Sequence, residues 1–242
     1  MALARLFGGS RPLLMAVGRI FAAALIAVSV ATTVALSVWI QHSKSDGSVN
    51  DRIDAKVISA TTGHRHLLTL LEAAGDLRTM AVLTLLVAGC CAALRNWRGV
   101  LLAAFSVPLA GALTEYVLKP LISGDSWAAF PSGHTTAGFA LATLVAVVAA
   151  STASRVPAVI RGLAALAFLA LAVAIGIAMI GLSDHFFTDT VGGAAVGVTV
   201  VLGGALVIDG LAAAIRVSSG QHASRQPASP GPPAPARAKG SQ

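Results

Sequence analysis

The chain has 242 residues, of which 56% are hydrophobic and only 11% are charged, and its formal net charge is +7. A soluble domain carries about 25% charged residues, so this composition excludes a water-soluble globular protein and indicates an integral membrane protein. The basic residues do not cluster with aromatic residues on a polar segment, and we therefore expect no nucleic-acid partner.

Six apolar runs follow one another along the chain, and a helix needs about 20 such residues to cross the hydrocarbon core. They cover residues 20–40, 79–94, 100–118, 135–153, 162–182 and 190–208. The second run is short and the third contains Glu115, whereas the other four carry no charge. The first run is longer than the roughly 7–15 apolar residues of a signal peptide, which favours an uncleaved anchor over a cleaved signal. The sequence thus predicts an all-α fold, a six-transmembrane helix bundle.

The distribution of charge predicts the orientation, because cytoplasmic loops are enriched in Lys and Arg. With the N-terminus inside, the inner loops hold 11 of the 17 basic residues: Arg5, Arg11, Arg19, Arg95, Arg98, Arg155, Arg161, Arg216, Arg225, Arg237 and Lys239. The first outer loop collects Asp46, Asp51, Asp54, Glu72 and Asp76. An even number of spans then places both termini in the cytoplasm, facing anionic inner-leaflet lipid.

One domain is expected, a six-span unit over residues 1–216. Within it, residues 41–77 form a polar outer loop that we expect to carry a short amphipathic helix. Residues 217–242 hold five of the ten prolines together with Ser, Ala and Gly. Such a segment lacks the apolar content to fold, and we expect a disordered cytoplasmic tail.

Polar residues gather at the predicted outer ends of the later spans. Pro131 and Gly133 would shape a turn into the fourth span, whose first amides have no internal acceptor and point toward an anion. Ser132 can cap this helix or donate to the same anion, and a plain N-cap is the alternative. Lys119 adds a cation nearby, and its alternative is a snorkelling lysine paired with Glu115 four residues earlier.

His185 and Asp189 are four residues apart, so they share one face of a helix. A carboxylate that bonds one ring nitrogen fixes the tautomer and makes the other nitrogen a better nucleophile. A second histidine, His134, would protonate a leaving oxygen. The alternative is an interfacial histidine beside an unrelated helix-capping aspartate.

In the order of these residues, the chain resembles the type-2 phosphatidic acid phosphatase family, integral-membrane lipid phosphatases related to vanadium haloperoxidases. The family carries three motifs: Lys-x6-Arg-Pro, Pro-Ser-Gly-His and Ser-Arg-x5-His-x3-Asp. The second is complete at residues 131–134, His185 and Asp189 complete the end of the third, and Lys119 matches the start of the first. The resemblance covers about residues 77–210 and implies a six-helix bundle.

Two motif arginines are missing. Ser126 and Trp127 stand where the family has Arg-Pro, and Ala178 and Met179 stand where it has Ser-Arg. In the family both arginines grip the phosphoryl oxygens, and loss of one preorganised donor typically costs about 10²–10³ in rate. The resemblance therefore leaves two functions open: an active but weakened phosphatase, and a catalytically impaired relative that binds lipid phosphate.

The first function is the one we expect: a lipid phosphate or diphosphate phosphatase working through a phosphohistidine at the outer face of the plasma membrane. The resemblance implies His185 as nucleophile, Asp189 as its orienting group and His134 as acid. The phosphate-binding residues would be Lys119, Ser132 and Gly133. Polyprenyl diphosphates and phosphatidic acid are the implied substrates, the bilayer is the only other partner expected, and no cofactor is required.

Another cation has to replace the missing arginines if the site is active. Arg78 lies at the predicted outer mouth of the second span and offers a two-pronged grip. Its alternative is an interfacial anchor or a partner of Asp76. Asp125, Asp184 and the histidines of residues 64–66 raise the question of a metal, but their spacing matches no metal site, and we expect none.

Two other classes of protein are alternatives to a phosphatase. A non-enzymatic scaffold on the same fold would lack turnover. A small transporter predicts charges buried in mid-span and symmetric halves, yet Asp209 is the single candidate charge in the last span and no repeat is visible. The 13 Arg against 4 Lys, with abundant Ala, indicate a GC-rich bacterial genome.

Overall fold

The computed structural model describes residues 11–42, 49–123, 130–152 and 155–224. Within that part of the chain, every regular element is helical. The elements are α2 (Ala16–His42), α3 (Val49–Thr61), α4 (Arg65–Gly75), α5 (Leu77–Ala93), α6 (Trp97–Leu113), the π-helix η1 (Thr114–Leu118), α7 (Lys119–Ser123), α8 (Gly133–Ser151), α9 (Ala158–Gly181) and α10 (Phe187–Ser224).

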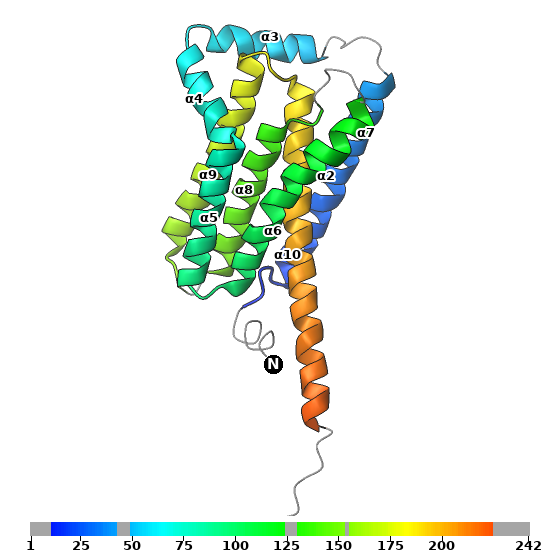
Figure 1. Cartoon of the computed structure of the whole chain (residues 1–242), viewed down its shortest axis with the longest axis vertical. Helices are drawn as coiled ribbons and strands as arrows, with labels where there is room; N and C mark the ends of the chain where they lie inside the picture. Colours follow the sequence, from blue (N-terminus) through cyan, green and yellow to red (C-terminus); the bar gives the residue numbers. More distant parts are fainter. Residues whose placement is uncertain (1–10, 43–48, 124–129, 153–154, 225–242) are drawn as a thin grey trace, which may run out of the picture.

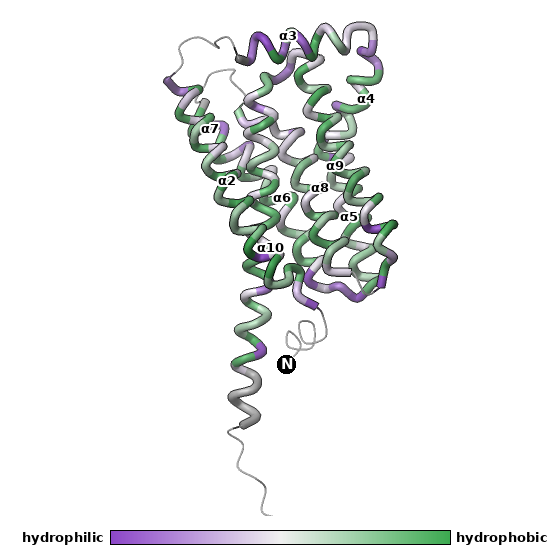
Figure 2. Tube along the Cα trace, turned by 180° about the vertical axis from the view of Figure 1, so that it is seen from behind, coloured by the Kyte–Doolittle hydropathy of each residue, from purple (hydrophilic) through white to green (hydrophobic). Residues whose placement is uncertain are grey.

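The predicted transmembrane bundle is confirmed. Five helical segments are long and apolar enough to cross a membrane, and a sixth results if α4 and α5, bent by 58° at their junction, cross together. The helices stand side by side with α3 lying across one end (Figure 1). We call this the α3 end, and the end at which α5 meets α6 the opposite end. Apolar residues dominate the helices between the two ends (Figure 2).

α8 is the central helix, because it packs against α9, α10 and α6. Its contact with α10 is close enough to require glycine. A Cβ at Gly193 would lie 2.5 Å from the carbonyl oxygen of Ser132, and one at Gly197 would lie 2.6 Å from that of Thr136. These glycines let the α10 backbone touch the first turns of α8. The start of α10 is thereby fixed against the start of α8.

A buried polar cluster holds the other half of α10. Asp209 accepts hydrogen bonds from the backbone N–H groups of Leu13 and Leu14, each at 2.9 Å. Arg98 of α6 donates to the same carboxylate at 2.9 Å, and its side chain is fully buried. A buried charge is tolerated when it is paired in this way. Asp209 therefore ties together α6, α10 and the segment before α2.

Two regions differ from the expected domain outline. The stretch 41–77, expected to be a loop with one short helix, contains both α3 and α4. α10 continues to Ser224, so helix extends past residue 217, where we expected the disordered tail to begin. Residues 225–242, the rest of that tail, lie outside the described residues.

Candidate active site

The first turn of α8 is built by Ser132. Its side chain accepts a hydrogen bond from the N–H of Thr135, and its carbonyl accepts one from Thr136. Ser132 is fully buried, so in this structure it acts as the helix N-cap. The amides of Gly133 and His134, the first two residues of the helix, precede any intrahelical acceptor. These N–H groups lie at the α3 end of the bundle and can bind an anion, and we call the site that they form the anion cradle.

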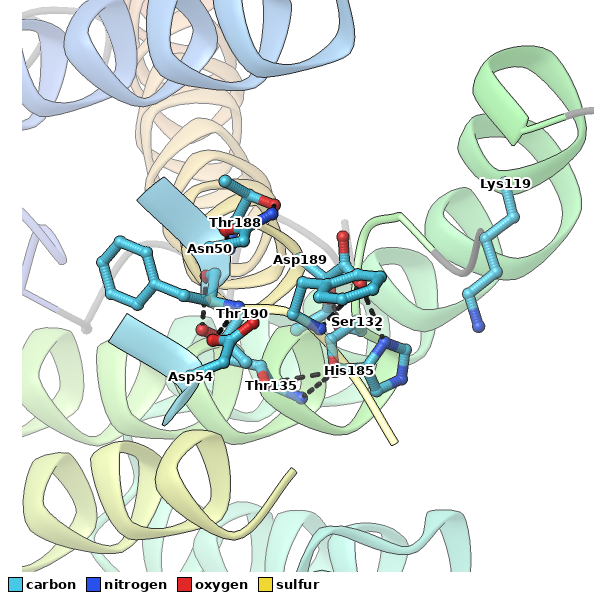
Figure 3. A network of polar contacts seen from close by, with 12 residues as sticks. Asn50, Asp54, Lys119, Ser132, Thr135, His185, Thr188, Asp189 and Thr190 are labelled. Atoms are coloured by element: carbon cyan, nitrogen blue, oxygen red, sulfur yellow. Dashed lines mark hydrogen bonds and ion pairs between the residues drawn. The ribbon is translucent and has the colours of Figure 1, made fainter. Parts of the chain in front are cut away.

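One backbone hydrogen bond joins this turn to the beginning of α10. The N–H of Ser132 donates to the carbonyl oxygen of Asp189 at 3.0 Å. The sequence segments around residues 132 and 189 are thus in direct contact, as Figure 3 shows. The close contacts of Gly193 and Gly197 with the α8 backbone hold the two helices in the same register.

His185 and Asp189 face each other, but not along one helix face as their spacing predicts, because His185 lies in the turn that precedes α10. The Nδ1 atom of His185 lies 3.4 Å from Oδ2 of Asp189, and both side chains are largely buried. The N–H of Phe186 donates to the same oxygen at 3.1 Å. A carboxylate only accepts hydrogen bonds, so this contact assigns the ring proton to Nδ1. The Nε2 atom then carries the lone pair.

The turn before His185 is held by the end of α9. The carbonyl oxygen of Met179 accepts hydrogen bonds from the N–H groups of Asp184 and His185, at 3.0 and 3.2 Å. Ser183, within this turn, has a φ of 65°, in the left-handed region that few non-glycine residues adopt. The turn points the His185 ring toward the start of α8 (Figure 3).

Lys119 approaches the cradle from the other side. Its Nζ atom lies 2.7 and 2.8 Å from the two carboxylate oxygens of Glu115. A Cβ built on Gly133 would lie 3.8 Å from that Nζ and would collide with Glu115. The π-helix η1, a distortion often found at functional sites, carries Glu115 to this position. The Lys119–Glu115 ion pair therefore lies directly beside the anion cradle.

His134 has a partner that the sequence did not predict. Its Nε2 atom lies 3.2 Å from Oδ1 of Asp76, which sits at the bend between α4 and α5. The neighbouring glycine makes this approach possible, because a Cβ on Gly75 would lie only 3.0 Å from the His134 ring. The signal in the sequence was the Gly-Asp dipeptide before the second apolar run, which can mark a helix break.

Two side chains of helix α3 form hydrogen bonds with the beginning of α10. Asp54 accepts a hydrogen bond from the N–H of Phe187 at 3.0 Å. Asn50 donates to the Thr188 hydroxyl at 3.0 Å and accepts from the Thr188 N–H at 3.3 Å (Figure 3). The pKa of Asp54 is raised above its ordinary value, chiefly because burial disfavours its charged form, and the nearby Asp189 adds to the effect. Asp54 and Asn50 are thus structural supports of the site that the sequence did not predict.

Comparison with known proteins agrees with this arrangement. The family model described as the PAP2 superfamily matches residues 79–211, more than half of the chain. The chain belongs to the PAP2 superfamily. No curated protein and no solved structure matches it. Members of this superfamily are generally phosphatases that act on lipid phosphates in membranes, and the matched region runs from α5 to α10.

The chain has other residues at the two positions where the motifs quoted above have arginine. Met179 stands at one of them, and its side chain is buried with 1% exposure. The other position, Ser126, lies outside the described residues, as do Trp127 and Asp125. Arg78, the candidate replacement, is exposed on the first turn of α5, two residues from Asp76. Among the described residues, no three His, Cys, Asp or Glu side chains group as metal ligands.

Proposed function

We propose that the chain hydrolyses a lipid phosphate or diphosphate through a phosphohistidine formed on His185. One observation carries the proposal: the hydrogen bond between the Ser132 N–H and the Asp189 carbonyl brings the anion cradle of α8 beside the His185–Asp189 pair. Lys119 lies against Gly133 on the opposite side of the same cradle. A phosphoryl group in the cradle would meet the helix amides, a cation and an oriented imidazole together.

In the first step, Nε2 of His185 attacks phosphorus while the bond to the leaving oxygen breaks. The proton held at Nδ1 remains hydrogen-bonded to Asp189, whose negative charge offsets the positive charge that develops on the ring. His134 donates a proton to the departing alcohol or phosphate, which leaves neutral or less charged. The amides of Gly133 and His134, with Lys119, stabilise the charge on the phosphoryl oxygens.

The second step returns the enzyme to its starting state. Water attacks the phosphorus of the phosphohistidine and gives a proton to His134, which now acts as the base. The P–N bond breaks, and its electron pair returns to Nε2 of His185. Inorganic phosphate is released, and neither step requires a redox partner.

We place the reaction at the outer face of a bacterial plasma membrane. The support is the excess of Lys and Arg in the predicted inner loops and termini, which hold 11 of the 17 basic residues. One of them, Arg95, lies between α5 and α6, at the opposite end from α3. Lipid substrates would reach the α3 end from the surrounding leaflet. Polyprenyl diphosphates and phosphatidic acid are the candidate substrates, since both present a phosphate on a long apolar chain.

The second candidate function is lipid phosphate binding without turnover. The buried Met179 favours it, because the guanidinium that other members place there is absent. Release of inorganic phosphate from a panel of lipid phosphates, with purified protein in lipid nanodiscs, distinguishes the two. Turnover that disappears in His185→Ala supports the phosphatase, whereas saturable binding without phosphate release supports the binding protein.

A further inference from the structure

We infer that Asp76 is a positioning residue for His134, and that it reserves the Nδ1 atom of His134 for proton transfer in both steps. The inference deepens the proposed function and rests on it. The contact between Oδ1 of Asp76 and Nε2 of His134 is 3.2 Å. A carboxylate only accepts hydrogen bonds, so Nε2 carries a proton and donates a hydrogen bond to Asp76.

The bend between α4 and α5 is arranged to make this contact. A Cβ on Gly75 would lie 3.0 Å from the His134 ring and 3.0 Å from Ile175 of α9, so a side chain at this position would force one of these neighbours to shift. The bend is held without the Asp76 side chain, because the Thr79 hydroxyl donates to the carbonyl of Ala73 at 2.8 Å. The carboxylate of Asp76 makes no capping hydrogen bond to α5. The carboxylate is instead directed to His134.

The proton balance follows from this geometry. Protonated His134 donates from Nδ1–H to the leaving oxygen, and the ring becomes neutral while Nε2–H stays with Asp76. In the second step, Nδ1 takes a proton from the attacking water, which restores the cationic ring. Asp76 neither gains nor loses a proton. It holds the same tautomer and ring orientation throughout, as a carboxylate behind a catalytic histidine does.

The site therefore has two carboxylate–histidine pairs with different tasks. In the pair at α10, Nδ1 of His185 is engaged and Nε2 is left for attack. In the pair at the α4–α5 bend, Nε2 of His134 is engaged and Nδ1 is left for proton transfer. The two pairs come from opposite sides of the α8 N-terminus.

The test compares two substrates that differ in their need for an acid. One is an alkyl phosphate, whose alkoxide is a poor leaving group. The other is a nitrophenyl phosphate carrying an alkyl chain of the same length, whose phenolate departs without protonation. The value of kcat/KM reports the steps up to departure of the leaving group, so hydrolysis of the phosphoenzyme does not enter the comparison.

General acid catalysis contributes about 10²–10⁴, and we expect Asp76→Ala to lower kcat/KM by about 30-fold for the alkyl phosphate and by less than about threefold for the nitrophenyl phosphate. Asp76→Asn keeps an oxygen acceptor and should lose less than Asp76→Ala. The matched control is Glu72→Ala, one turn earlier on α4, which should change both values by less than about twofold. Equal losses on the two substrates, or no loss on the alkyl phosphate, would overturn the inference.

A measurement independent of turnover separates this inference from the proposed function. The ¹⁵N shifts of the His134 ring in nanodiscs, assigned with His134→Gln, report which nitrogen is protonated in the neutral form. We expect protonated Nε2 in the wild type and a mixture of tautomers in Asp76→Ala. Protonated Nδ1 in the wild type, or identical spectra for the two proteins, contradicts the role of Asp76 even if the protein proves inactive. Failure of the wild type to hydrolyse any lipid phosphate refutes the proposed function alone.

Discussion

The substitution Asp189→Asn distinguishes two ways in which the carboxylate could support His185. Asp189 Oδ2 receives two donors, the N–H of Phe186 at 3.1 Å and Nδ1 of His185 at 3.4 Å. An asparagine has one oxygen and one NH₂ group to present. The backbone N–H of Phe186 cannot change its role, so the amide oxygen must take the Oδ2 position. His185 would therefore keep its proton on Nδ1.

This geometry sets the expected magnitude. In a serine-protease triad, the same change costs about 10⁴ because the histidine adopts the wrong tautomer. Here the tautomer is retained, and the loss is the difference between a charge-assisted and a neutral hydrogen bond, about 1–2 kcal/mol. That difference corresponds to a fall of about 5- to 30-fold in kcat/KM. Asp189→Ala removes the acceptor altogether, and we expect it to lose about 10²–10³.

The assay is phosphate release from a lipid phosphate by the three proteins at matched concentration in nanodiscs. Phosphoenzyme trapped by alkaline quench, which preserves the P–N bond, shows whether the first step is the one that slows. Equal losses in Asp189→Asn and Asp189→Ala, near 10⁴-fold, would refute this reasoning, because the Phe186 N–H would then fail to hold the amide in place.

Four further predictions concern the orientation of the chain, Arg78, Glu115 and Asp209. A cysteine introduced at Ser123 should be labelled by a membrane-impermeant thiol reagent in intact cells, and labelling only after lysis would reverse the orientation. Arg78→Ala should lower turnover by about one to two orders of magnitude, less than a buried donor because Arg78 is exposed, and unchanged turnover excludes it as the substitute arginine. Glu115→Gln frees Lys119 for the substrate and should lower KM by about two- to fivefold, the value of a partly exposed ion pair, whereas a raised KM contradicts competition for the lysine. Asp209→Ala removes the buried carboxylate that binds Arg98 and the N–H groups of Leu13 and Leu14, and it should destabilise the protein by about 3–5 kcal/mol in thermal unfolding; a loss below about 1 kcal/mol would show that the Asp209–Arg98 pair is not structural.

Much of the fold was predictable because a membrane limits the possible structures. A chain in lipid must satisfy its backbone hydrogen bonds within helices, so long apolar runs identified the spans directly. The structure places α8 at Gly133–Ser151 and α9 at Ala158–Gly181, within a few residues of the expected ranges. In the candidate site, Lys119 lies near Gly133, and the hydrogen bond between Ser132 and Asp189 brings the start of α8 beside the His185–Asp189 pair.

The supporting carboxylates were not predictable by the same reasoning. Asp54 and Asp76 belong to the acid-rich stretch before the second span, in which nothing marks them as supports of the site. Their contacts depend on the direction of α3 and on the 58° bend between α4 and α5. Neither the hydrophobic periodicity nor the motif spacing predicts the direction of α3 or the bend between α4 and α5. A polar residue that supports a site from a separate helix leaves little trace in a single sequence.

Without the two motif arginines, the site has few positive charges to offset the negative charges of a phosphoryl group. The described part of the site has one lysine, and Glu115 already binds it. Three further carboxylates lie close by, those of Asp54, Asp76 and Asp189, and each supports a neighbouring group. A phosphoryl group adds about two negative charges. In the proposed mechanism, the proton that His134 gives to the leaving group would therefore serve first as a positive charge beside the phosphate.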